Sequence, residues 1–254
     1  MLTAFGKTCR VFWRGDGPSV LVLHELPGMT LFDIDFALRL SNQGFRVYLP
    51  LLFGEPGDDK FVSRFWSECV FGRWPWEELE PKNPWVPPLI GLVDAIYAVA
   101  PGPIGVVGMC LTGLLPVSLM ASPHVVAPVV CQPTMPLPID DERAAVLGLP
   151  KSEVDRARTR MDAEQLQVLA FRASTDCYCP GTRFDTLQHT FGDRLIRRDV
   201  DFAGAHGHSI LAAEYYRPEM APGVKARVHA AFDETVAFLT RQLTRHSGAQ
   251  ADGV

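Results

Sequence analysis

One cysteine of this chain stands where the sequence pattern changes from a strand to a helix. Cys110 lies in the turn 108–113 (Gly-Met-Cys-Leu-Thr-Gly), between an apolar, β-branched run at 104–108 and a helical pattern at 111–121. A sharp turn of this kind lifts one side chain above the sheet. The helix N-terminus beneath that side chain favours a thiolate over a thiol. The segment therefore predicts a cysteine nucleophile.

Two glycines and a threonine shape this expected turn. Gly108 leaves room for a strained backbone, and Gly113 lets the helix pack closely on the strand. Thr112 stands two residues after the nucleophile, where the simplest turn of this type has glycine. The backbone N–H of Leu111 is expected to be one donor to an oxyanion. Because free cysteines are often small core residues, the turn alone also fits a buried, unreactive Cys110.

A nucleophile of this type needs a histidine base and a carboxylate that orients it, in the chain order nucleophile, acid, histidine. Asp176 follows an expected strand at 166–171, and His206 and His208 follow another at 195–200. Catalytic groups gather at the carboxyl ends of parallel strands. Each residue also has a plain alternative, because Asp176 could cap a helix and the histidines could lie in a solvated loop. The combined order and placement predict a catalytic triad.

The elements that must position these residues alternate between strands and helices. Buried strands are expected at 19–23, 45–49, 104–108, 125–130 and 166–171, with an antiparallel edge strand at 10–13 and a polar strand at 195–200. Helices are expected at 30–43, 88–100, 111–121, 183–191 and 226–245. The pattern predicts an α/β protein with a mostly parallel, doubly wound sheet and helices on both faces. We expect a single domain at 1–246, a wall of the active site at 74–88 and a disordered tail at 247–254.

The composition excludes several classes of protein. The 254 residues are 47% hydrophobic and 21% charged with a net charge of −5, and no basic stripe suggests nucleic acid. No apolar run reaches the roughly 18–20 residues of a membrane helix, and no secretory signal is visible. The six cysteines are scattered, and the close pair Cys177 and Cys179 lacks a second pair of zinc ligands. We expect a cytoplasmic protein with reduced thiols and neither a metal nor an organic cofactor.

Four segments of the chain resemble the dienelactone hydrolase family. They are 24–28 (His-Glu-Leu-Pro-Gly), 108–113, 176–180 (Asp-Cys-Tyr-Cys-Pro) and 207–209 (Gly-His-Ser). The resemblance runs from the first core strand to the last helix, and it is poor over 53–88. It implies an α/β-hydrolase fold and a triad of Cys110, His208 and Asp176. The neighbouring His206 matches the His-Gly form of other members and stays open as the base.

The resemblance also implies roles around the triad. Glu25, after the first core strand, would contact the thiol at rest and help to generate the thiolate when substrate arrives. Leu26 would supply the second oxyanion N–H. The family's best-known members bind a lactone carboxylate with arginines, one of them shortly after the histidine, but residues 209–213 contain none. Arg64, Arg73 and Trp74 are therefore the candidates for binding substrate, and the missing arginine argues against dienelactone itself.

These observations together predict a hydrolase of carboxylic esters or lactones that forms a thioester at Cys110. The expected partner is a small-molecule substrate, with no nucleic acid and no membrane, for a monomer or small homo-oligomer. Two alternatives stay open. One keeps the fold and cleaves thioesters or transfers acyl groups, and the other is a non-catalytic binding protein of the same fold.

Overall fold

The computed structural model describes residues 2–4, 7–57 and 83–251. Its main sheet has seven strands in the order β3-β5-β4-β6-β7-β8-β9, and only β3 runs antiparallel to its neighbour. The strands are β3 (Val11–Arg14), β4 (Ser19–Leu23), β5 (Arg46–Pro50), β6 (Ile104–Met109), β7 (Val125–Cys131), β8 (Val168–Ala173) and β9 (Leu195–Val200). The mostly parallel α/β sheet expected from the sequence is confirmed. A separate two-stranded ladder joins β1 (Leu2–Ala4) to β2 (Lys7–Cys9).

The four central strands form the core. Every residue of β4, β6, β7 and β8 is buried, whereas β9 at the edge has exposed charged residues. Strands covered on both faces by helices show this continuous burial, because neither face meets water. The near-unbroken apolar runs in the sequence follow from the same cause.

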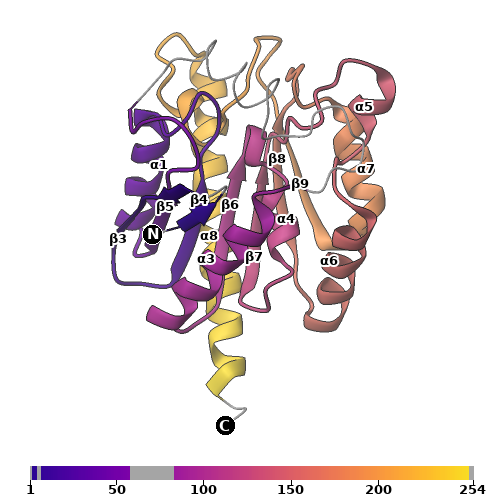
Figure 1. Cartoon of the computed structure of the whole chain (residues 1–254). Helices are drawn as coiled ribbons and strands as arrows, with labels where there is room; N and C mark the ends of the chain where they lie inside the picture. The colour runs from indigo at the N-terminus through magenta and orange to yellow at the C-terminus, as the bar shows by residue number, and fades with distance from the viewer. Residues whose placement is uncertain (1, 5–6, 58–82, 252–254) are drawn as a thin grey trace.

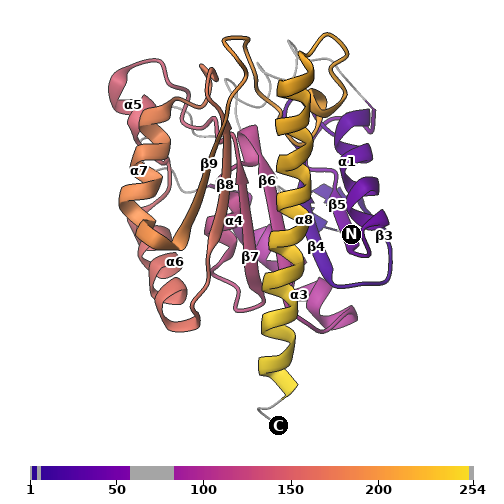
Figure 2. The ribbon, with the colours of Figure 1, turned by 180° about the vertical axis from the view of Figure 1, so that it is seen from behind.

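Helices cover both faces of the sheet (Figures 1 and 2). One face carries α1 (Leu31–Asn42) and the long α8 (Pro222–Ala251), which meet through an edge-to-face contact between Phe36 and Phe232 at 6.2 Å. The other face carries α3 (Val86–Val99), α4 (Leu115–Leu119) and α6 (Lys151–Glu164). Beside β9 lies α7 (Gly181–Phe191), next to the short α5 (Asp141–Ala145). No helix in the described part of the chain combines the length and apolar character needed to cross a bilayer.

Several elements differ from the sequence expectation. The single helix expected at 111–121 is a 3₁₀ turn, η2 (Cys110–Thr112), followed by α4. A disordered tail was expected at 247–254, but α8 continues to Ala251 and so includes the first five of these residues. Both α5 and α6 were missed. Of the 14 residues of α6 only Ala157 and Met161 are buried, so the helix lacks an apolar stripe that a pattern could reveal.

The expected active-site wall at 74–88 is described only from residue 83 onward. There Trp85 is fully buried and precedes α3, which starts at Val86, two residues before the expected boundary. Prolines in its first turn suit a helix start, where the backbone N–H has no intrahelical acceptor. Arg64, Arg73 and Trp74 lie outside the described residues.

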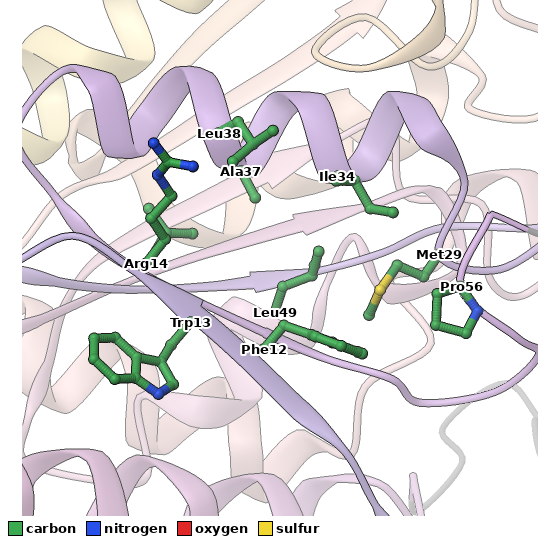
Figure 3. Close-up of a pocket in the computed structure, with 10 residues that line it drawn as sticks. Phe12, Trp13, Arg14, Met29, Ile34, Ala37, Leu38, Leu49 and Pro56 are labelled. Atoms are coloured by element: carbon green, nitrogen blue, oxygen red, sulfur yellow. The ribbon is translucent and has the colours of Figure 1, made fainter.

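An apolar groove of about 230 Å³ lies between α1 and strands β3 and β5 (Figure 3). Its lining includes Phe12, Trp13, Ile34 and Leu49. Strand β4 stands between this groove and β6, which carries the expected nucleophile. The groove is therefore not the place where the chemistry expected from the sequence would occur.

Candidate active site

Cys110 stands at the junction of β6 and η2 with a strained backbone. Its φ of +50° is in the left-handed region, which costs a residue with a Cβ on the order of 1 kcal/mol or more. The turn also requires glycine at Gly108, where a Cβ would lie 2.3 Å from the Thr112 carbonyl oxygen and 2.7 Å from Pro116. This is the geometry of a turn that presents one side chain above the sheet.

Thr112 secures this turn to the neighbouring strand. Its hydroxyl accepts from the Met109 N–H at 3.0 Å and lies 3.0 Å from the Leu23 carbonyl oxygen and 2.9 Å from that of Met109. The side chain is fully buried. The departure from glycine at this position thus links the end of β6 to the end of β4, a contact that glycine could not make.

His208 and Asp176 form a hydrogen-bonded pair beside the cysteine. The Nδ1 of His208 lies 2.7 Å from the Asp176 carboxylate, which is buried and also accepts from the backbone N–H groups of Tyr178 at 2.9 Å and Cys179 at 3.1 Å. A ring nitrogen of His208 lies within 4.8 Å of the Cys110 sulfur, and since Asp176 holds Nδ1, Nε2 is the nitrogen available to the sulfur. These contacts join the three residues of the expected triad.

The charge balance around His208 favours its protonated form. Burial lowers the pKa of the imidazole, but the negative charges of Cys110 and Asp176 outweigh burial and raise the pKa well above its usual value. A raised histidine pKa is typical of a thiolate–imidazolium pair. His206 is exposed, whereas His208 is half-buried with its Nδ1 2.7 Å from Asp176, so His208 is the histidine that pairs with the acid.

Glu25 completes a cluster with the cysteine and the histidine. Donor atoms of Glu25, Cys110 and His208 all lie within 4.8 Å of one another. The Glu25 carboxylate is buried and accepts from the Ser209 hydroxyl and from the Gln132 amide at 3.2 Å. Burial raises its pKa, although the charge of His208 and both hydrogen bonds act in the opposite direction. A carboxyl in this setting can hold a proton close to the thiol.

The side chain of His24 holds the backbone of Glu25 in place. Its Nε2 accepts from the Leu52 N–H at 3.0 Å, so Nδ1 carries the proton and donates to the Glu25 carbonyl oxygen at 3.2 Å. Burial lowers the pKa of His24 to about 4, which keeps the ring neutral. His24 is therefore a structural residue that fixes the chain where β4 ends.

Three polar residues of the site escaped the sequence analysis. Thr134 donates its hydroxyl to the Cys110 sulfur at 3.3 Å, and Gln132 and Ser209 hold Glu25. Gln132 and Thr134 follow the strand expected at 125–130, so their position at a strand's carboxyl end was the signal that could have found them. Ser209 lies directly after the histidine.

The two expected oxyanion donors are near the cluster. Leu111 follows Cys110 in the first turn of η2, where backbone N–H groups have no intrahelical acceptor. Leu26 is half-buried and follows Glu25 after β4. A small cavity of about 30 Å³ opens beside Cys110, and its lining is apolar except for Asn83 and the cysteine itself. The other lining residues are Leu111, Leu114, Leu115, Pro133, Met135, Leu147, Gly148 and Leu149.

Comparison with known proteins supports the fold. No protein-family model and no curated protein matches the sequence. Among solved structures, one assigned to the dienelactone hydrolases, from Klebsiella pneumoniae, superposes with a TM-score of 0.61 at 18% identity, over 92% of this chain and 95% of that one. A dienelactone hydrolase-like promiscuous phosphotriesterase from metagenomic libraries gives 0.59 at 17%, over 91% and 92%. Est1E from Butyrivibrio proteoclasticus, solved with ferulic acid, gives 0.61 at 14%, over 96% and 98%. The chain has the α/β-hydrolase fold.

Proposed function

We propose that this protein hydrolyses carboxylic esters or lactones with Cys110 as its nucleophile. The observation that carries the proposal is the grouping of three residues: the strained Cys110 has its sulfur within 4.8 Å of a ring nitrogen of His208, whose Nδ1 lies 2.7 Å from the buried Asp176. Each member has the chemistry of its role: a sulfur that can attack, an imidazole that can move a proton, and a carboxylate that holds the imidazole. We place the enzyme in the cytoplasm, where the thiol stays reduced.

The reaction proceeds through a thioester. The Cys110 thiolate attacks the carbonyl carbon, and the resulting oxyanion accepts hydrogen bonds from the N–H groups of Leu111 and Leu26. The alkoxide leaves with the proton from His208, which leaves a neutral imidazole and an acylated sulfur. That imidazole takes a proton from water, and the hydroxide attacks the thioester. Collapse of the second oxyanion releases the carboxylic acid and restores the thiolate.

Glu25 and Thr134 set the state of the sulfur in this scheme. A protonated Glu25 donates to the thiolate, and an ionised Glu25 accepts the thiol proton, so the carboxyl can shuttle one proton at a distance within 4.8 Å of the sulfur. The Thr134 hydroxyl donates to the sulfur in the thiolate form, which stabilises the negative charge.

The cavity beside Cys110 favours a short, apolar acyl group. Its described lining, which includes Leu114, Leu147 and Leu149, is apolar, and its volume of about 30 Å³ leaves room only for a small group beside the sulfur. The described residues that line it include no cation, and the two arginines expected to bind substrate, Arg64 and Arg73, lie outside the described residues. The apolar character of the described lining favours a neutral ester or lactone as the substrate.

Hydrolysis of p-nitrophenyl acetate and butyrate tests the proposal. We expect activity that disappears in Cys110→Ala, and rapid quenching followed by intact-mass measurement should detect an acylated wild-type chain. Full activity in Cys110→Ala would refute the nucleophile. An added amine or alcohol that captures most of the acyl group would show acyl transfer instead of hydrolysis, and an iodoacetamide-inert Cys110 would indicate the non-catalytic alternative.

A further inference from the structure

The cluster around Cys110 also has the composition of a metal site. It offers a cysteine sulfur, an imidazole nitrogen and a carboxylate oxygen, which are the three kinds of ligand that Zn²⁺ takes in proteins. Oxygen-seeking cations such as Mg²⁺ and Ca²⁺ are poorly matched to a set that contains sulfur and nitrogen. The donor set therefore selects for a thiophilic cation.

The distances are close to those of a three-ligand zinc site. The donor atoms of Glu25, Cys110 and His208 lie within 4.8 Å of one another. Zinc–ligand bonds of about 2.0–2.3 Å place neighbouring donors of a tetrahedral site about 3.3–3.6 Å apart. The largest separation allowed by the cluster, 4.8 Å, exceeds this range by about 1 Å, so cation binding requires the donors to close by no more than that.

The surrounding contacts resemble the outer shell of a metal site. Asp176 holds Nδ1 of His208, which fixes the ring and leaves Nε2 as the nitrogen available to a cation. A histidine that binds zinc through one nitrogen commonly donates the other N–H to a carboxylate. Ser209 and Gln132 orient the Glu25 carboxylate in the same way. These contacts orient the imidazole and the carboxylate before a cation binds.

A cation here would occupy the place of the reacting ester. Three protein ligands leave a fourth tetrahedral position free for water. The cavity that reaches Cys110 has about 30 Å³, and a water needs roughly 10–15 Å³. Coordination also uses the sulfur lone pair that would attack the carbonyl carbon.

We propose that Glu25, Cys110 and His208 form a reversible binding site for Zn²⁺, and that the bound cation inhibits the enzyme in competition with its ester substrate. The binding rests on the geometry of the cluster alone, whereas the competition rests on the proposed function. The cation acts as an inhibitor and has no part in the hydrolytic reaction described above.

Optical titration of the reduced, full-length protein with Co²⁺ tests the site. We expect a thiolate-to-cobalt charge-transfer band in the near ultraviolet that saturates at one equivalent and disappears when Zn²⁺ is added. The band should be lost in Cys110→Ser and retained in Cys177→Ser, a matched control because Cys177 is exposed and near the site. Glu25→Gln should weaken binding at least about 10-fold, and Asp176→Asn about 10–100-fold.

The results separate this inference from the proposed function. A band that persists in Cys110→Ser, or the absence of a one-equivalent band, would overturn the zinc site even if the protein hydrolyses esters. A band of the expected kind without any ester hydrolysis would leave the zinc site standing and remove the proposed function. If both hold, Zn²⁺ should inhibit the hydrolysis of p-nitrophenyl acetate competitively. Its inhibition constant should equal its dissociation constant within about threefold. A non-competitive pattern of inhibition would contradict the shared site.

Discussion

Removing the Thr112 hydroxyl should destabilise the turn that presents Cys110. In Thr112→Val the Met109 N–H loses its acceptor inside the core, since the hydroxyl oxygen lies 3.0 Å away and the residue is fully buried. An unsatisfied buried N–H costs about 1–3 kcal/mol, and the lost hydrogen bond to the Leu23 carbonyl adds about 0.5–1.5 kcal/mol. Since valine has nearly the shape of threonine, we expect a loss of about 2–4 kcal/mol without a cavity term.

Thr112→Ser is the matched control. It keeps the hydroxyl and removes one buried methyl group, which costs about 1 kcal/mol. Urea unfolding followed by circular dichroism should therefore order the three proteins as wild type, Thr112→Ser and Thr112→Val. For a chain of this size the valine variant should melt about 5–15 °C below the wild type. A valine variant as stable as the wild type, or more stable than the serine variant, would refute the role given to the hydroxyl.

Three further predictions concern catalysis and pH. Asp176→Asn should lower kcat/KM for p-nitrophenyl acetate about 10²–10⁴-fold, because it releases His208. The control His206→Gln should stay within about twofold of the wild type. Equal losses in the two variants would contradict the assignment of His208 as the base. Thr134→Val removes the hydroxyl that lies 3.3 Å from the Cys110 sulfur. It should lower kcat/KM about 3–10-fold and move the acid limb of the pH–rate profile to higher pH. An acid limb at the same pH as in the wild type would argue against stabilisation of the thiolate by Thr134. His24 has its folded pKa lowered from 6.5 to about 4, so the unfolded chain binds more protons in between. The free energy of unfolding therefore falls as the pH drops from 6.5, by on the order of 3 kcal/mol at pH 4 from this residue alone. Urea unfolding at several pH values should show that the free energy of unfolding of His24→Gln depends less steeply on pH between 6.5 and 4 than that of the wild type.

The sheet was predictable because its central strands are buried on both faces. Continuous apolar runs marked β4, β5, β6, β7 and β8 to within a few residues, and the antiparallel edge strand was also anticipated. The helix α6 was not, because only Ala157 and Met161 of its residues are buried and they leave no apolar stripe for a pattern to reveal. The break between η2 and α4 also escaped prediction.

The candidate site was predictable in its residue types and less so in its contacts. The order of Cys110, Asp176 and a histidine along the chain, each after a strand, was visible in the sequence. Which histidine pairs with Asp176 was not, because His206 and His208 share one loop, and only the folded chain leaves the first exposed and turns the second toward Asp176.

By itself, the sequence determined the alternation of strands and helices, the turn at Cys110 and the strand ends that carry the acid and the histidine. These features depend on neighbouring residues, whose spacing encodes burial and backbone strain. Only the tertiary structure decided that His208 bonds Asp176 and that Ser209 and Gln132 hold Glu25. Ser209 lies 184 positions from Glu25 along the chain, and Gln132 lies 107 positions from it. Contacts of this kind arise when distant strand ends meet at one edge of the sheet, and no local pattern records them.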